Sequence, residues 1–275
     1  MKVPHKLSVL LQHCLPQHLL SRIFGCLAAS RITWLKNNLI QWFVKRYQID
    51  MSTAKYERLS AYQSFNDFFT RELKPALRPV DTNPNTICSP VDASVSQFGK
   101  IHQESVLQAK GIHYSLVKLI NDPVSYKPFI NGHFITLYLS PRDYHRVHMP
   151  VDGTLYRADY IPGRLFSVNE VSVNSITGLF SRNERLICYF NSAIGDCILI
   201  MVGAMLVAGI ETVWTKEQQA QLQDQPIPLA KGEELGRFTF GSTVILLFNH
   251  KHPLQWQEAI QPDQHLQYGQ AIALY

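Results

Sequence analysis

The chain reads GRFTFGSTVILLF over residues 236–248, and this stretch decides both the fold and the chemistry that we expect. Its alternating and then continuous apolar residues predict strands on either side of Gly241 and Ser242. Gly241 has no Cβ, so the backbone can bend there and the Ser242 hydroxyl can reach the carbonyl that precedes it. That geometry permits an N→O acyl shift, in which Ser242 attacks its own peptide bond. A bare Gly-Ser-Thr is otherwise typical of a β-bulge or a tight turn.

Upstream of this stretch, short β-like runs are separated by turn residues. They lie at residues 155–160, 165–168, 186–190, 197–202 and 205–213. Strands at such spacing are typical of a mostly antiparallel sheet. A polar segment precedes them and includes a short predicted helix that begins at Phe65, with Asn66 or Ser64 as its cap. Residues 51–275 are therefore expected to form one β-rich domain.

Residues 1–50 have the pattern of amphipathic helices. Apolar residues recur at helical spacing in two stripes: Leu19, Leu20, Ile23, Phe24 and Leu27, then Ile32, Leu35, Leu39 and Phe43. Seven Lys or Arg residues accompany a single acid, Asp50. Such helices suit the surface of an anionic membrane, but they also suit a helical layer that covers the core, and the pattern leaves both open. The predicted fold class is α+β: N-terminal amphipathic helices followed by a mostly antiparallel β-rich core.

The composition limits the classes of partner. The 275 residues are 46% hydrophobic and carry a formal net charge of +5, which favours anionic partners. The excess is modest and no long Lys/Arg run occurs, so we expect no nucleic-acid binding. The five cysteines are odd in number and form no CxxC pair, which indicates free thiols in a reducing compartment. No stretch reaches the roughly 18 to 20 uninterrupted apolar residues of a membrane-spanning helix.

Three further residues carry groups suited to proton transfer. Asp92 follows Ser-Pro-Val at a strand end, where an aspartate alone is typical of local backbone capping. His145 and His148 follow an apolar strand at residues 134–139. Three residues apart, they point to opposite faces of a strand and converge only in a helix or tight turn. The spacing lacks the glutamate of a metalloprotease helix, so we expect no metal and interpret the pair as proton-transfer groups or hydrogen-bonded structure.

A serine, a histidine pair and an aspartate are the parts of a nucleophile, a base and an orienting group. The serine lacks the Gly-x-Ser-x-Gly elbow of lipid hydrolases. The sequence instead resembles the phosphatidylserine decarboxylases of the bacterial and mitochondrial type, in FGST (240–243), YHRVHMP (144–150) and SPVD (89–92). The resemblance continues in order through residues 68–71, 109–111, 166–169, 182–185 and 202–204. Phe240 replaces the leucine that the family usually has, an apolar exchange that leaves the chemistry intact and can alter the cleavage rate.

The resemblance implies a self-cleaving proenzyme. Asp92 orients and polarises His148, which takes the proton of Ser242, and the serine oxygen attacks the carbonyl of Gly241. The resulting ester eliminates to leave dehydroalanine, which hydrolyses to a pyruvoyl group and ammonia. Gly241 and Ser242 are thus the expected cleavage site, and Ser242 is the expected source of the cofactor.

The resemblance also implies what the cleaved protein does. Its long beta chain is residues 1–241, and its short alpha chain, residues 242–275, begins with the pyruvoyl group. The ketone condenses with the amino group of phosphatidylserine, and the imine accepts the electrons left by the departing CO₂. His145 is the candidate for returning a proton to that carbon, and hydrolysis releases phosphatidylethanolamine.

A lipid substrate with two acyl chains brings the enzyme to the bilayer, so residues 1–50 become the expected interfacial anchor. The family and the cysteine usage together imply a peripheral protein on the cytoplasmic face of a bacterial inner membrane, and a homodimer of processed protomers. Two other functions suit the same residues. A lipid or ester hydrolase would use the Asp-His-Ser set on an uncut chain, and a β-rich membrane-surface module would bind without catalysis. A denaturing gel separates them, because the decarboxylase alone gives two bands.

Overall fold

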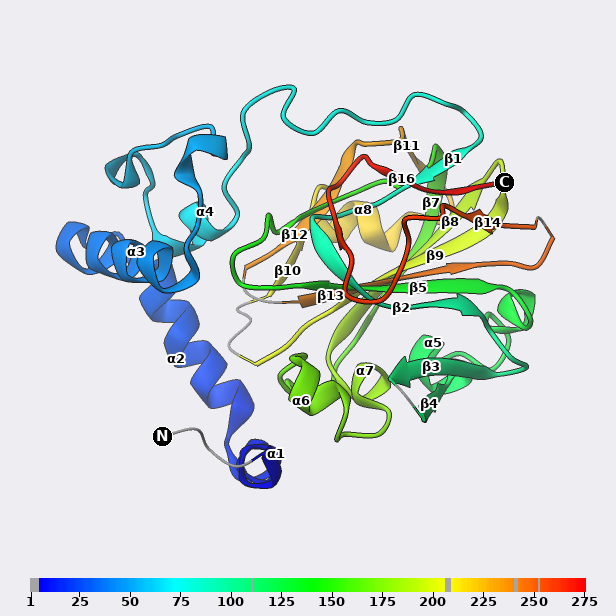
Figure 1. Cartoon of the computed structure of the whole chain (residues 1–275), viewed down its shortest axis with the longest axis horizontal. Helices are drawn as coiled ribbons and strands as arrows, with labels where there is room; N and C mark the ends of the chain where they lie inside the picture. Colours follow the sequence, from blue (N-terminus) through cyan, green and yellow to red (C-terminus); the bar gives the residue numbers. More distant parts are fainter. Residues whose placement is uncertain (1–4, 110, 206–208, 240–241, 252) are drawn as a thin grey trace.

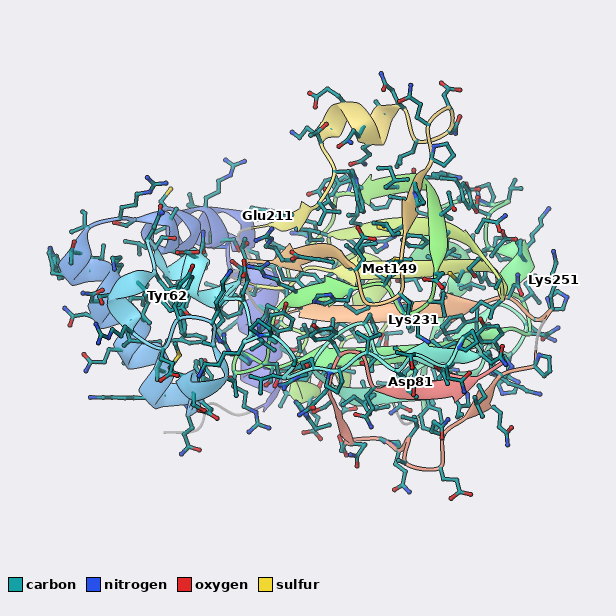
Figure 2. All side chains as sticks on the ribbon, turned by 90° about the horizontal axis from the view of Figure 1, so that it is seen from above. Tyr62, Asp81, Met149, Glu211, Lys231 and Lys251 are labelled. Atoms are coloured by element: carbon teal, nitrogen blue, oxygen red, sulfur yellow. The ribbon has the colours of Figure 1, made fainter. Side chains whose placement is uncertain are left out.

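The computed structural model describes residues 5–109, 111–205, 209–239, 242–251 and 253–275 (Figure 1). It confirms the α+β class, with the longer helices at the N-terminus and antiparallel sheets after them. The first four helices lie to one side of the β core, and Figure 2 shows the same separation, with Tyr62 in the helical part and Met149 in the β core. These helices are α1 His5–Cys14, α2 Gln17–Ala29, α3 Thr33–Tyr47 and α4 Phe65–Phe69.

The helices share a small hydrophobic core with the segment that follows them. Phe43 of α3 is buried against Phe65, Phe68 and Phe69 of α4, with ring centroids 5.0, 6.2 and 5.8 Å apart. Ser64 caps α4 with its side chain, which confirms the short helix and one of its two predicted caps. The helical unit, α1 to α4 with the turns Met51–Thr53 and Leu59–Ala61, therefore extends past residue 50.

The outer side of this unit is apolar and exposed. Leu19, Ile23 and Leu27 recur every four residues along α2 and are 55%, 52% and 47% exposed. Trp34 and Trp42 of α3 are also exposed. The helices thus pack on protein, as a helical layer that covers a core does, and they also present an apolar stripe to solvent; the membrane-surface interpretation stays a prediction. In the part of the chain that the structure describes, no helix is both long and apolar enough to cross a bilayer.

Two glutamines join the helical unit to the β core. The side-chain oxygen of Gln12 accepts a hydrogen bond from the Ser167 amide, and that of Gln17 accepts one from the Leu165 amide, both at 2.8 Å. Both glutamine side chains are buried. These contacts explain why the strand predicted at residues 165–168 is wrong: the amides of Leu165 and Ser167 bond to side chains of α2 and α1, and that of Phe166 bonds to Asn183, instead of a neighbouring strand.

An eight-stranded antiparallel sheet forms the centre of the molecule, in the order β11-β7-β8-β9-β13-β5-β2-β15. All seven residues of β13 are buried, because both faces of the sheet are covered. Val244 and Leu246 join one hydrophobic cluster, and Ile245 and Leu247 join the other. A strand buried on both faces reads as a continuous apolar run, as this one does. The strands are β2 Ala93–Lys100, β5 His133–Leu139, β7 Gly153–Ile161, β8 Arg185–Ser192, β9 Gly195–Val202, β11 Ile227–Leu229, β13 Ser242–Phe248 and β15 His265–Leu266.

Smaller elements cover the two faces. The three-stranded sheets β1-β16-β14 and β10-β12-β6 lie on the face of Val244, and the hairpin β3-β4 with α5 and α7 lies on the face of Ile245. The strand predicted at 205–213 is found only as β10, and residues 206–208 lie outside the described residues. The strands are β1 Thr86–Cys88, β3 Ser105–Ala109, β4 Ile112–Ser115, β6 Arg146–His148, β10 Ile210–Thr212, β12 Glu234–Phe238, β14 Gln255–Trp256 and β16 Ala271–Leu274. The short helices are α5 Leu116–Ile120, the turn Lys127–Phe129, α6 Glu170–Val173, α7 Leu179–Arg182 and α8 Lys216–Ala220.

Candidate active site

Neighbouring strands of the central sheet bring two of the predicted residues to one edge. Tyr138 on β5 pairs with Ser94 on β2 and with Thr243 on β13. Asp92 stands directly before β2 and Ser242 begins β13, so both lie at this edge with β5 between them. Two strand spacings separate them, which is on the order of 10 Å.

Ser242 is completely buried, with an exposed fraction of 0%. Its Oγ has no hydrogen-bond partner among the described residues, and a buried hydroxyl left unpaired costs about 1–3 kcal/mol. Side chains alternate along a strand, so Ser242 shares its face with Val244, the face that β6 and β12 cover. Gly241, the other half of the expected cleavage site, and Phe240 lie outside the described residues.

His148, at the end of β6, is held as a neutral imidazole. Its Nδ1 lies 2.9 Å from the Gly232 carbonyl, and a carbonyl only accepts, so Nδ1 carries the proton. Nε2 is the acceptor and lies 3.2 Å from the Tyr144 hydroxyl. Tyr268 stacks on the ring at a centroid distance of 4.0 Å. Burial lowers the pKa of His148, which keeps Nε2 unprotonated and able to take a proton.

Asp92 reaches His148 indirectly. Its carboxylate accepts hydrogen bonds from Arg78, the shortest at 2.7 Å, and from the Tyr268 amide at 2.9 Å. Tyr268 therefore connects the two residues, because its amide binds Asp92 while its ring stacks on His148. The charge of Asp92 also opposes the effect of burial on the His148 pKa. The Gly232 carbonyl is the group that orients His148 here, and the direct orienting role of Asp92 stays a prediction.

His145 is also buried and neutral. Its Nδ1 donates to the Asp143 carbonyl at 2.8 Å, and its Nε2 has no hydrogen-bond partner within the described ranges. Burial lowers the pKa of His145 to about 3. Its ring packs on Phe69 of α4 at 4.1 Å, and its carbonyl accepts from the Phe238 amide at 3.0 Å. His145 thus lies between the helical unit and the end of β12. That strand ends at Phe238, four residues before Ser242 in the chain.

The structure adds residues that the sequence patterns did not single out. Asp143 accepts from the Ser140 hydroxyl at 2.8 Å and binds His265 Nε2 at 3.1 Å. Ser140 follows Leu139, the backbone partner of Ser242. Asp143 had a local signal in its position beside the histidine motif. His265 on β15 and Tyr268 in the turn after it had none, because they come from the end of the chain and reach the site only through folding.

A cavity of about 260 Å³ opens beside these residues, between the helical unit and the edge of the sheet. Its walls include Ile49 and Arg71 on one side and Asp92, Tyr144 and His265 on the other. Within the residues that the structure describes, no three His, Cys, Asp or Glu side chains are grouped as they would be to hold a metal ion. The arrangement offers a buried serine hydroxyl, two neutral imidazoles and a polar cavity.

Comparison with known proteins gives a consistent result. Residues 65–274 match the family model described as phosphatidylserine decarboxylase, and residues 7–48 match a model described as PSD. The chain is 46% identical to the phosphatidylserine decarboxylase proenzyme of Pseudomonas fluorescens Pf-5, over 98% of this chain and 97% of that protein. It is 47% identical to the proenzyme of Ectopseudomonas mendocina, over 97% of each chain, and 48% identical to that of Pseudomonas fluorescens SBW25, over 98% of each.

Proposed function

Because the chain belongs to the phosphatidylserine decarboxylase family, we propose that it removes CO₂ from phosphatidylserine to form phosphatidylethanolamine in phospholipid biosynthesis. The proenzyme form for which its relatives are named fits a chain that first cuts itself between Gly241 and Ser242. One observation carries this proposal: the Ser242 hydroxyl is buried and unpartnered among the described residues, on the sheet face that the histidine-bearing β6 covers.

We assign the cleavage step to Asp92, His148 and Ser242. His148 Nε2 is unprotonated and accepts the proton of Ser242 Oγ, while its Nδ1 proton stays in the bond to the backbone. The charges of Glu234 and Asp92 favour the imidazolium that forms. Arg78 and the Tyr268 amide hold the Asp92 carboxylate in place, so that its charge can favour this imidazolium.

The residues fit a pyruvoyl group derived from Ser242. Residue 242 begins β13, and the ladders with β5 and β9 hold residues 243–248 in place whether or not the preceding bond is cut. When formed, the group supplies a ketone that draws electrons from the substrate's α-carbon as CO₂ leaves. We assign His145 to the return of the proton. With its pKa lowered to about 3, the protonated ring is a strong donor, but it forms only where a nearby negative charge favours it.

We propose that residues 1–50 hold the protein at a membrane surface and that residues 51–275 form the catalytic region. The exposed stripe of Leu19, Ile23 and Leu27 supports this, because burying one such side chain is worth about 1.5–3 kcal/mol. All five cysteines are free, as suits the cytoplasmic face. A homodimer of processed protomers is the assembly that we propose from the family.

A denaturing gel and intact-mass measurement test the assignment. Wild-type protein should give two chains, the shorter beginning with a ketone, whereas Ser242→Ala and His148→Ala should give one. His145→Ala should cleave normally but decarboxylate about 10² to 10⁴ times more slowly, as expected for loss of a general acid. His113→Ala, a change at an exposed histidine, is the control and should resemble the wild type. An active wild-type protein with an uncut chain would contradict the proposal, and release of fatty acid by that chain would indicate a hydrolase.

A further inference from the structure

Arg71 is a buried cation whose hydrogen-bonding capacity is largely unused. It follows α4, is 4% exposed, and donates from Nη2 to the Arg142 carbonyl at 3.1 Å. Its Nε and Nη1 have no hydrogen-bond partner among the described residues. Leaving a buried guanidinium unsatisfied costs several kcal/mol. Arg185 shows the contrast, because this buried arginine donates to four backbone carbonyls.

The acidic side chains near Arg71 are engaged elsewhere. Burial lowers the pKa of Arg71, and the charges of Asp92 and Asp143 only partly oppose this effect. Asp92 is bound by Arg78, and Asp143 is bound by His265. The ion pairs found among the described residues do not include Arg71. Nε and Nη1 of Arg71 therefore have no acidic partner among the described residues, and a bound anion could supply the missing acceptor.

The unused donors belong to a residue that lines the cavity of about 260 Å³, together with Arg78 and Arg142. That volume is many times the roughly 10–15 Å³ that one water molecule needs in the same measure, so a phosphate group and part of its ester substituents can enter. Gln48 contributes a neutral polar side chain to the opposite wall. Asp50 in that wall already caps the next turn, by accepting from the backbone at 2.9 Å.

The cavity adjoins both the exposed helices and the imidazoles. One wall is formed by residues 48–50, which directly follow α3 in the chain, and α3 carries the exposed tryptophans. Another wall contains Tyr144, whose hydroxyl lies 3.2 Å from His148 Nε2. The ring of His145 packs on Phe69, two residues before Arg71. An anion bound here would therefore lie between the lipid-facing surface and the groups that move protons.

We propose that this cavity binds the phosphodiester of the phospholipid headgroup and that Arg71 is its main ligand, an inference that rests on the substrate proposed above. The planar guanidinium fork matches two phosphate oxygens, and charge-assisted bonds of this kind are the strong ones. Such an anion would also act on catalysis. Burial and, less strongly, the charge of Arg71 hold down the pKa of His145, so neutralising Arg71 favours the protonated His145 that donates to the substrate.

Calorimetric titration of the uncut Ser242→Ala protein with glycerophosphoserine, and separately with inorganic phosphate, tests this site without turnover. Adding Arg71→Met should weaken glycerophosphoserine binding about tenfold or more. Arg71→Lys should give an intermediate loss, because lysine keeps the charge but not the fork. Arg58→Met, at an exposed arginine of the same helical unit, is the matched control and should change nothing. If Arg71→Met melts well below its parent, Arg71→Lys carries the test.

In the cleavable protein, Arg71→Met should raise KM for phosphatidylserine vesicles by a similar factor, with a gel used to measure the cleaved fraction of each variant so that only processed protein is compared. Loss of phosphate binding with unaltered glycerophosphoserine binding would show a site for free anions and overturn the headgroup assignment. Equal affinities in all variants would overturn the site itself. Binding of glycerophosphoserine through Arg71 in a protein that makes no phosphatidylethanolamine would support the site and contradict the proposed activity.

Discussion

The attachment of the N-terminal helices to the β core should depend on two buried glutamines. Gln12 accepts from the Ser167 amide and donates to Ser172 Oγ at 3.0 Å, and Gln17 accepts from the Leu165 amide. Changing both glutamines to alanine removes these partners. The hydrogen bond at Leu165 is buried, so leaving its amide without a partner costs about 1–3 kcal/mol of stability, and the part-buried Ser167 amide costs less. Since 1.4 kcal/mol is about a factor of ten, the Leu165 amide should exchange roughly 10 to 100 times faster.

Hydrogen–deuterium exchange of the intact protein measures this effect residue by residue. Gln17→Ala alone should accelerate Leu165 more than Ser167, and Gln12→Ala alone should do the reverse. Gln41→Ala, at an exposed glutamine of α3, is the control and should leave both amides protected. Unchanged exchange at both amides in the double variant would refute the reasoning, because the helices would then be attached by contacts other than these bonds.

Two further predictions concern the membrane surface and pH. Ile23→Glu should weaken binding to anionic vesicles about tenfold or more, from the loss of about 1.5–3 kcal/mol of apolar burial, whereas Gln41→Glu adds the same charge with little effect; equal co-sedimentation of the two variants would argue against the α2 stripe. The hydrogen bond to Asp143 raises the pKa of His265 in the folded protein. The pair of protonated His265 and Asp143 therefore stabilises the fold below about pH 6.5, and this stabilisation is lost as the pH rises through the pKa of the folded state. In His265→Ala, the free energy of unfolding should therefore fall less as the pH rises above about 6.5. If urea denaturation gives the same pH dependence for the variant and the wild type, the pair contributes nothing to stability.

Local patterns predicted the elements whose apolar residues recur regularly or form a continuous run. The apolar run after Ser242 became β13, and the amphipathic pattern before Asp50 became α2 and α3. The same reasoning failed at residues 165–168, where β-like composition was outweighed by side chains of distant helices that bind the backbone amides. A periodicity describes which face is apolar, but it does not describe which remote polar group will take a backbone donor.

The site shows the same limit. The motif at residues 144–150 contains both imidazoles, but which ring nitrogen carries the proton depends on carbonyls that they meet in space, that of Gly232 for His148 and that of Asp143 for His145. Tyr268 lies 176 positions from Asp92 and binds it through its amide. No local pattern marks these contacts with Gly232, Asp143 and Tyr268, so they cannot be predicted from the order of residues.

The sequence by itself predicted the α+β class, because strand propensity and apolar spacing are properties of short segments, and its resemblance to a known family predicted the roles of Ser242, His145 and His148. The tertiary structure alone decided that Ser242 is buried with no hydrogen-bond partner among the described residues, that Tyr268 bridges Asp92 and His148, and that Arg71, two of whose donors are unpaired within those residues, lines a cavity. Those properties depend on desolvation and on contacts between segments far apart in the chain, and both arise only when the sheet edge and the helical unit come together.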